Sequence, residues 1–169
     1  PASGVSLIGN ALANFLRGGE GNDTFVVGDG DTVEGGGGAD LFVVTGSSAF
    51  IQANEAGLDT LRSSVSYDLR NAPGINTLFY TGTAGAELSA NGVEGAIYGG
   101  TGNDTLRDGN AEQEGVTLFG GGGSNVYRIN TPLTRISDVN GVNSRIETRN
   151  SLNLAAGDFA GINHAALIG

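Results

Sequence analysis

Residues 18–26 read GGEGNDTFV, which places three glycines and one aspartate in six residues directly before three residues that favour β-strands. Close copies stand at 35–43 (GGGGADLFV) and 99–107 (GGTGNDTLR). In each copy glycine occupies positions one, two and four, aspartate occupies position six, and an apolar residue occupies position eight. This spacing predicts a repeat architecture with a unit of about nine residues.

Weaker copies flank the full ones. The segment 9–17 has Asn14 at the carboxylate position, 27–34 is one residue short but keeps Asp31, and 120–128 has Asn125. A further weak copy places Glu87 at the carboxylate position. The apolar position eight recurs along most of the chain, at Leu7, Leu16, Phe25, Val33, Phe42, Ile51, Phe79, Leu88, Ile97, Leu106, Leu118, Tyr127 and Ile136.

A nine-residue period does not fit an α-helical stripe, and runs of glycine destabilise helices. Short strands joined by tight turns fit it, with position eight pointing inward and positions seven and nine pointing outward. We therefore predict an all-β solenoid of stacked turns. Glycine makes up 31 of the 169 residues, a share far above the average of about 7%, as many tight turns require.

We expect one continuous domain in four parts. Residues 1–43 form a first repeat block, 44–81 form linking strands that continue the solenoid, 82–128 form a second block, and 129–169 form a C-terminal cap. The cap is expected to contain strands at 134–137 and 144–148 and a short helical turn near 155–159. A competing interpretation of 44–81 is a set of longer alternating strands that pack against the solenoid.

Composition narrows the choice of partners. The chain has 18 acidic and 8 basic residues, a formal net charge of -10, no cysteine and one histidine. This balance argues against nucleic acid and anionic membranes as partners, and it suits cations. No apolar run is long enough for a membrane span. No GxSxG or HExxH motif is present, so we expect a protein that is not an enzyme.

The repeat has the chemistry of a calcium site. Alternate glycines can turn several carbonyl groups toward one point, and an aspartate two residues later can reach the same point. Such a set of oxygen ligands suits Ca²⁺ better than Mg²⁺ or Zn²⁺. With two strands per turn, repeats two apart stack on one edge, so the sequence pairs Asp23 with Asp40, Asn14 with Asp31, and Asp104 with Asn125. We expect the two asparagines to weaken their sites.

An isolated aspartate after glycines is more often a turn former that bonds its own backbone. On this basis the remaining aspartates are interpreted as solvated or capping residues, and the single histidine as a surface residue. These residues are Asp29, Asp59, Asp68, Asp108, Asp138, Asp158 and His164.

The segments GGEGNDTFV, GGGGADLFV and GGTGNDTLR resemble the nonapeptides of RTX (repeats-in-toxin) proteins. The resemblance implies a right-handed parallel β-roll that binds a few calcium ions at its turns, roughly two to five here because the repeats are few. It implies carboxylate ligands at Asp23, Asp31, Asp40 and Asp104, a weaker ligand at Asn14, and carbonyl ligands from the glycines of the same turns. These glycines are Gly19, Gly21, Gly36, Gly38, Gly100 and Gly102.

The same resemblance implies export by type I secretion, folding on calcium binding outside the cell, and a place within a larger secreted or cell-surface bacterial protein. An alternative role is a surface assembly, adhesion or polysaccharide-binding module that contacts other subunits or extracellular glycans. Phe15, Tyr67 and Tyr98 are the aromatic residues expected on the outer surface for such a role.

Overall fold

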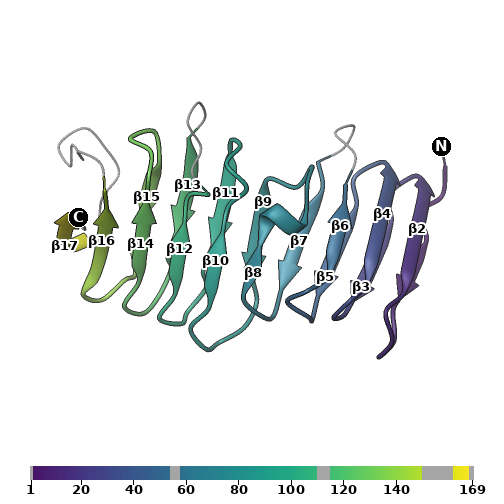
Figure 1. Cartoon of the computed structure of the whole chain (residues 1–169), viewed down its shortest axis with the longest axis horizontal. Coiled ribbons are helices and arrows are strands. Elements are labelled where there is room, and N and C mark those ends of the chain that lie inside the picture. The colour runs from purple at the N-terminus through teal and green to yellow at the C-terminus, as the bar shows by residue number, and fades with distance from the viewer. Residues whose placement is uncertain (1, 54–57, 110–114, 150–161, 168–169) are drawn as a thin grey trace.

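The computed structural model describes residues 2–53, 58–109, 115–149 and 162–167. The chain forms an elongated β-solenoid with its N- and C-termini at opposite ends (Figure 1). Every strand pair among the described residues is parallel, as expected when each turn of a solenoid adds a strand to each sheet. The predicted all-β solenoid is confirmed. The described residues contain no helix long and apolar enough to cross a membrane.

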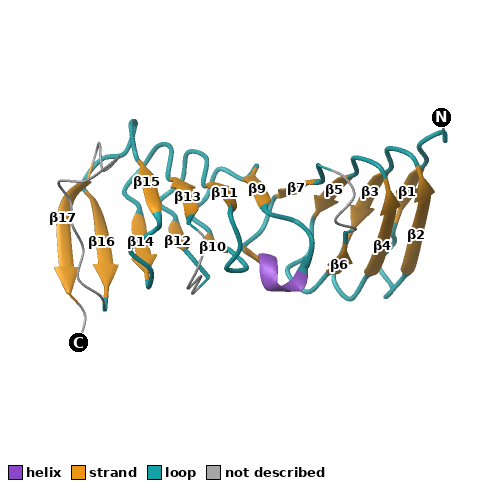
Figure 2. Ribbon diagram, turned by 90° about the horizontal axis from the view of Figure 1, so that it is seen from above, coloured by secondary structure: helices purple, strands orange, loops and turns teal. Residues whose placement is uncertain are grey.

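One face of the solenoid is a single eight-stranded sheet, and the opposite face is divided into a three-stranded and a six-stranded sheet (Figure 2). The eight-stranded sheet contains, in order, β1 (Ser6–Ile8), β3 (Thr24–Val27), β5 (Leu41–Val44), β7 (Thr60–Ser63), β9 (Thr77–Tyr80), β11 (Gly95–Tyr98), β13 (Val116–Phe119) and β15 (Arg135–Ser137). The three-stranded sheet contains β2 (Phe15–Glu20), β4 (Thr32–Gly37) and β6 (Phe50–Gln52). The six-stranded sheet contains β8 (Tyr67–Asp68), β10 (Glu87–Ser89), β12 (Thr105–Arg107), β14 (Val126–Ile129), β16 (Ser144–Thr148) and β17 (Ile162–Leu167).

The core is made of columns of apolar side chains, to which several strands contribute two residues, such as Phe25 and Val27 on β3. In the register of the strand pairs, Phe25 lies beside Phe42, and Phe42 lies beside Leu61. The rings of Phe25 and Phe42 stack with their centroids 5.0 Å apart, close to the spacing of neighbouring strands. Side chains in this column are buried while their sequence neighbours are partly exposed, as the alternation of a strand requires.

The prediction for one member of this column is wrong. Leu78, and not Phe79, occupies the inward position on β9, since Leu78 pairs with Leu61 and is fully buried. Phe79 points outward and stacks on Tyr98, which in turn stacks on Phe119, with centroids 4.5 Å apart in both pairs. Ten residues separate Leu78 from Leu88, the next core position, so counting nine residues back from Leu88 selects Phe79 instead of Leu78.

The glycine-poor middle of the chain lies within the stacked sheets. β7 pairs with β5 on one side and with β9 on the other, so this segment supplies strands to the same ladder as the repeats. On the opposite face the ladder is interrupted between β6 and β8. A short 3₁₀-helix, η1 (Leu69–Asn71), follows β8 at this interruption and places Leu69 in the core.

The C-terminal strands extend both faces. β15 pairs with β13, β16 pairs with β14, and β17 pairs with β16. The strands expected at 134–137 and 144–148 therefore correspond to β15 and β16. The helical turn expected near 155–159 lies outside the described residues, as does most of the insertion between β12 and β13.

The middle of the chain supplies a test of the ladder. We expect Leu61→Ala to lower the free energy of unfolding of the calcium-loaded protein by about 2–5 kcal/mol, because Leu61 is fully buried between two rungs. The matched control is Leu12→Ala, which removes the same atoms from a side chain that is 72% exposed and should change stability by less than about 0.5 kcal/mol. Denaturant titration compares the two, and equal effects would contradict the position of β7 in the core.

Candidate metal centre

The corners of the solenoid stack along two edges. On the return edge, where the chain enters the eight-stranded sheet, Asp23, Asp40 and Asp59 stand directly before β3, β5 and β7. On the outgoing edge, where the chain leaves that sheet, Asn14, Asp31, Asp104 and Asn125 stand directly before β2, β4, β12 and β14. The pairings expected from the spacing thus lie on consecutive rungs of one edge.

The carboxylates at these corners are buried and form a ladder of hydrogen bonds. The backbone N–H of Asp23 donates to Asp40 Oδ1 at 2.8 Å, and the N–H of Val5 donates to Asp23 Oδ1 at 2.7 Å. On the outgoing edge, the N–H of Asn14 donates to Asp31 Oδ1 and that of Ala86 to Asp104 Oδ1, both at 2.8 Å. Each carboxylate therefore satisfies a backbone donor of the preceding rung, which explains why it points into the corner.

The first glycine of each repeat makes room for the second carboxylate oxygen. A Cβ atom on Gly99 would lie 2.7 Å from Asp104 Oδ2 and 2.8 Å from the Gly120 carbonyl oxygen. A Cβ on Gly18 would overlap both Asp23 Oδ2 and the Gly35 carbonyl oxygen. At both corners, a carboxylate oxygen and a carbonyl oxygen from the next rung converge on one space that only glycine leaves open.

The glycines expected to offer carbonyl ligands have a second role. Gly36 and Gly38 have positive φ angles of 104° and 119°, and side chains there would overlap the carbonyl oxygens of Gly19 and Gly21 one rung below. These glycines allow the backbones of successive corners to approach closely. Gly100 also has a positive φ, and its carbonyl accepts the N–H of Gly122 at 2.8 Å. The Ala84 carbonyl lies next to the α-carbon of Gly102, and the Gly102 carbonyl lies next to that of Gly123.

The second oxygens of several carboxylates have no hydrogen-bond partner in the described structure. These buried atoms are Oδ2 of Asp40, Asp59, Asp104 and Asp138. Burial raises the pKa of Asp104 to about 6. It also raises the pKa of Asp40, where the N–H of Asp23 opposes the shift and the charges of Asp59 and Asp23 reinforce it. A buried ionised oxygen without a partner is costly, so these positions call for a cation.

Three predicted residues are already well supplied with donors. Asp23 accepts the N–H of Val5 on one oxygen and that of Gly19 on the other, at 2.7 and 2.9 Å. Asp31 accepts the N–H of Asn14 on one oxygen and that of Gly28 on the other, both at 2.8 Å. Asn14 Oδ1 accepts the N–H of Asn10 at 2.7 Å. Hydrogen bonds hold the corner of Asn14 and Asp31 together. Oxygen lone pairs remain for a cation, but because both Asp31 oxygens already accept a hydrogen bond, this corner is a weaker candidate than Asp40 or Asp104.

Neutral donors fill the corresponding space at Asn125. Its Oδ1 accepts the N–H of Asp104 at 2.9 Å, as a carboxylate would, but its Nδ2 donates to Asp138 Oδ1 at 2.9 Å. The Tyr127 hydroxyl donates to the same oxygen at 2.6 Å, and a Cβ on Gly120 would overlap this hydroxyl and Asp138 Oδ1. Amide and hydroxyl hydrogens thus occupy the space beside Gly120 that stays open beside Gly99.

Glu87 does not occupy a carboxylate position. Ala86 stands there, since its N–H donates to Asp104 Oδ1, and Glu87 points outward on β10. The Glu87 carboxylate pairs with Arg107, whose Nε lies 2.7 Å from Oε1. Glu87 contributes to a row of ion pairs on the outer face, together with Arg17–Glu34 and Arg128–Glu147.

Three of the aspartates interpreted as solvated or capping residues are buried: Asp59, Asp108 and Asp138. Asp108 accepts the backbone N–H groups of Asn130 and Thr131, as a capping residue does, whereas Oδ2 of Asp59 and of Asp138 has no partner in the described structure. Asp59 is 6% exposed and Asp138 is fully buried. A signal for Asp59 was present, because the segment 59–62 (DTLR) repeats 104–107 (DTLR) and keeps Gly57 at position four, although the glycines at positions one and two are replaced. Asp138 follows β15 at the start of a corner, where the nonapeptide pattern places glycine, and no periodic signal identifies it.

The donor set suits calcium. Within 2–53, 58–109, 115–149 and 162–167, no three acidic or histidine side chains gather closely enough to bind one ion. Rungs are about 4.8 Å apart, so an ion between two corners meets one carboxylate from each and must complete its shell with carbonyl oxygens. Hard neutral oxygens with one or two carboxylates are ligands that Ca²⁺ accepts.

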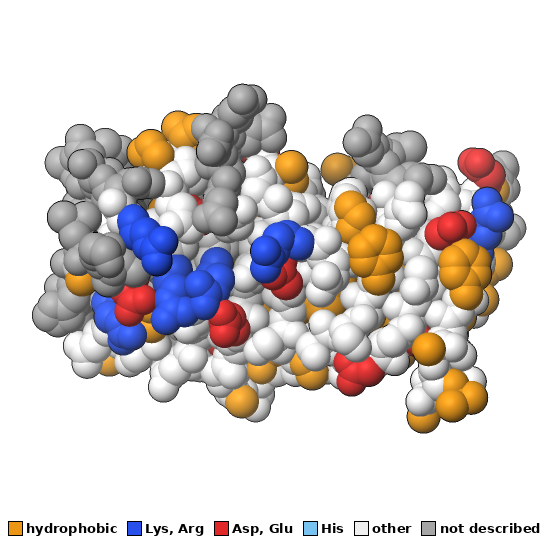
Figure 3. Space-filling model, in the orientation of Figure 1, with side chains coloured by type: hydrophobic (Ala, Val, Ile, Leu, Met, Phe, Trp, Pro, Cys, Tyr) orange, Lys and Arg blue, Asp and Glu red, His pale blue; other side chains and the backbone are white. Residues whose placement is uncertain are grey.

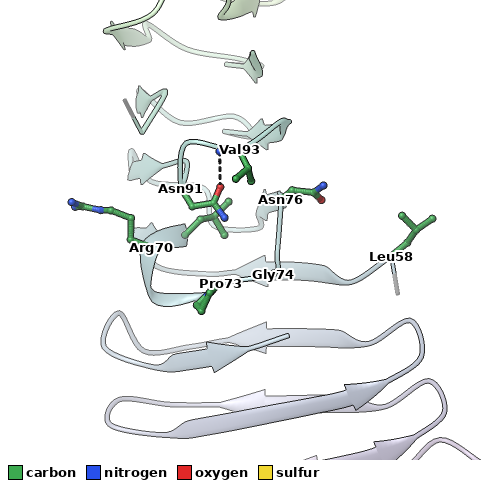
Figure 4. A pocket seen from close by; sticks show the side chains of 8 residues that line it. Leu58, Arg70, Pro73, Gly74, Asn76, Asn91 and Val93 are labelled. Atoms are coloured by element: carbon green, nitrogen blue, oxygen red, sulfur yellow. Dashed lines mark hydrogen bonds between the residues drawn. The ribbon is translucent and has the colours of Figure 1, made fainter. Parts of the chain in front are cut away.

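A pocket elsewhere in the described structure lacks this chemistry. It has a volume of about 650 Å³ and lies near the interruption between β6 and β8 (Figure 4). Its lining is Leu58, Leu69, Arg70, Pro73, Gly74, Asn76, Asn91 and Val93. It contains no carboxylate, and the Arg70 guanidinium is paired with Asp68. The pocket does not fit a cation.

Comparison with known proteins agrees with this chemistry. A family model described as RTX calcium-binding nonapeptide repeat (4 copies) matches residues 8–42 and 96–111. These ranges contain Asn14, Asp23, Asp31, Asp40 and Asp104 and do not contain Asp59 or Asp138. No curated protein and no solved structure matches the chain. The resemblance to RTX repeats is confirmed.

Two adjacent glycines provide a test of the open space at the corner. We expect Gly18→Ala to destabilise the calcium-loaded protein by about 1–3 kcal/mol or more, because the new Cβ overlaps a carboxylate and a backbone carbonyl. Gly19→Ala should change stability by no more than about 0.5 kcal/mol, since nothing lies within 4 Å of its Cβ position. Thermal unfolding in excess calcium measures both, and equal stability of the two variants would contradict the geometry.

The raised pKa of Asp104 predicts pH-dependent calcium binding. Because burial raises this pKa to about 6, the metal-free fold takes up a proton as pH falls through 6, whereas the unfolded chain, with a pKa near 3.8, does not. Acid therefore stabilises the metal-free fold and competes with the cation. We expect calcium affinity to fall between pH 7.5 and pH 5, and Asp104→Asn to reduce this dependence. Calorimetric titration at both pH values measures it, and an affinity independent of pH would refute the prediction.

Proposed function

Because the chain carries RTX calcium-binding nonapeptide repeats, we propose that it is a structural module whose folding is coupled to calcium binding. Family and fold make it a calcium-binding β-solenoid. The observation that carries the proposal is the set of buried carboxylate oxygens at stacked corners that have no partner among the described residues. Calcium supplies the missing positive charge at these positions.

The ligands that we propose lie at the stacked corners. Asp40 and Asp104 come first because each has an unpartnered buried oxygen beside the first glycine of its repeat. Asp23 and Asp31 add carboxylates on neighbouring rungs, and Asn14 adds a neutral oxygen. Carbonyl oxygens complete the shells, with Gly19, Gly21, Gly36, Gly38, Gly100 and Gly102 as candidates; the geometry adds Gly35 and Gly120. This set supports roughly two to five ions.

Coupling to folding follows from two costs. Without a cation, carboxylates one rung apart on the same edge repel one another inside the protein. The glycine-rich corners also lose much backbone freedom on folding. Calcium that binds only the folded chain offsets both costs and adds stability as RT ln(1 + [L]/Kd). Extracellular calcium modules are typically tuned to about 10⁻⁴–10⁻³ M, and we expect this range here.

This coupling suits a protein that crosses a membrane before it folds. We propose that the module belongs to a larger bacterial protein, is exported unfolded by type I secretion, and folds at the higher calcium concentration outside the cell. The net charge of -10 helps to keep the metal-free chain extended. RTX repeats are calcium-binding structural elements, and we propose no catalytic role for this chain.

A second candidate role is contact with glycans or other subunits through the outer surface. Two of the three aromatic residues expected there do point outward: Phe15 is 63% exposed on β2, and Tyr98 lies in the stack on the eight-stranded sheet. The expectation for Tyr67 is wrong, because its ring is buried and its hydroxyl donates to the Ala49 carbonyl at 2.8 Å. Figure 3 shows basic side chains gathered over the C-terminal half of one face, where Arg107 and Arg128 pair with Glu87 and Glu147.

Chelation tests the proposed coupling. We expect the far-ultraviolet circular dichroism of the protein to change from β-rich to largely unfolded when EGTA is added, and to recover when calcium is restored. An identical spectrum with and without EGTA would rule out the proposal.

Matched variants locate the effect at the corners. We expect Asp40→Asn and Asp104→Asn to raise the calcium concentration at the folding midpoint on the order of tenfold, because ligand charge sets calcium affinity. The control is Glu34→Gln, which removes the same charge from an outward side chain paired with Arg17 and should leave the midpoint nearly unchanged. If all three variants shift the midpoint equally, net charge and not the corner sites controls folding.

A further inference from the structure

Asp59 stands one rung beyond Asp40 on the return edge, outside the segments that match the RTX repeat. The two residues precede β5 and β7, and the residues that follow them, Leu41 and Thr60, are register partners. Asp59 is 6% exposed and Asp40 is 2% exposed. The return edge therefore carries a row of three buried carboxylates, Asp23, Asp40 and Asp59.

Asp59 is held in the same way as Asp40. Its Oδ1 accepts the backbone N–H of Asp40 at 2.8 Å, and Asp40 Oδ1 accepts the N–H of Asp23 at the same distance. Its Oδ2 is buried and unpartnered, as is Oδ2 of Asp40. In Asp23, by contrast, Oδ1 accepts the N–H of Val5 and Oδ2 that of Gly19. The two adjacent carboxylates with a free oxygen are thus Asp40 and Asp59.

No positively charged side chain among the described residues forms an ion pair with either of these two carboxylates. Among the ion pairs that the described residues form, none includes Asp40 or Asp59. Two buried carboxylates on neighbouring rungs raise each other's energy, and the N–H ladder satisfies only one oxygen of each. A cation between the rungs would satisfy both remaining oxygens. Gly35 leaves space beside Asp40 Oδ2, since a Cβ on Gly35 would lie 2.6 Å from this oxygen.

We propose that Asp59 is a calcium ligand, and that Asp40 and Asp59 together hold a calcium ion on the return edge. The inference rests on the proposed function, because it extends the row of calcium sites into a segment that the RTX family model does not match and that lacks the first two glycines of the nonapeptide. The purely oxygen donor set argues against zinc, which prefers nitrogen or sulfur, and the spacing of one carboxylate per rung favours calcium over magnesium.

The hydrogen-bond ladder alone does not require a carboxylate at this position. Asn125 Oδ1 accepts the N–H of Asp104 at 2.9 Å, and Ser144 Oγ accepts the N–H of Asn125 at 2.9 Å. Neutral side chains therefore perform the same structural role elsewhere in this solenoid. A carboxylate at position 59 brings a buried charge that the ladder does not use.

The experiment uses Asp59→Asn and Asp59→Ser in the full chain, two variants that copy Asn125 and Ser144 and so keep an acceptor for the Asp40 N–H. Native mass spectrometry and calorimetric titration with calcium alone count the bound ions. We expect each variant to bind one ion fewer than the wild type and to fold at a calcium concentration higher on the order of tenfold. Glu34→Gln is the control and should keep the wild-type count.

The outcomes separate this inference from the proposed function. A wild type that binds no calcium refutes the proposed function and the inference with it. A wild type that binds calcium, with variants that keep the same count and affinity, overturns the inference about Asp59 alone. Failure of both variants to fold at any calcium concentration would assign Asp59 a structural role and would also overturn it.

Discussion

The structure depends on one hydrogen bond repeated at many of its corners, in which a side-chain oxygen accepts the backbone N–H of the preceding rung. At Asp40, Asp59 and Asp104 this bond draws a carboxylate into a space that water does not reach and leaves its second oxygen without a partner. The hydrogen bond that joins the rungs thus holds a negative charge in a buried position, where it must be neutralised. Stacking of the strands and binding of a cation are two parts of one constraint.

Most of the fold follows from the nine-residue period, because a strict repeat with one inward apolar side chain per strand leaves few alternatives to stacked parallel strands. The prediction fails where the repeat is irregular. Leu78 and not Phe79 enters the core, since ten residues instead of nine separate it from Leu88, and a shift of one residue reverses which side chain points inward. The sheet is also interrupted between β6 and β8, where η1 follows β8, and nothing in the periodicity of the sequence predicts this interruption.

The candidate site was predictable wherever glycines accompany the aspartate, as at Asp23, Asp40 and Asp104. Glu87 was assigned one residue out of register, because a weak copy does not distinguish Ala86 from its neighbour. Asp59 was missed because this copy of the repeat keeps only one of the three glycines, Gly57, before the carboxylate. Asp138 also lies inside the solenoid, but it stands at the start of its corner and not at the end. Its Oδ1 accepts hydrogen bonds from Asn125 Nδ2 and from the Tyr127 hydroxyl. Such a contact depends on two rungs meeting in space and cannot be predicted from spacing along one repeat.

The central claim is that calcium neutralises the unpartnered carboxylate oxygens at the corners. Anomalous scattering from crystals grown in calcium tests this most directly, because it locates each ion. The account predicts peaks within about 2.3–2.6 Å of Oδ2 of Asp40 and of Asp104. Well-ordered crystals in millimolar calcium with no peak at either oxygen would contradict it.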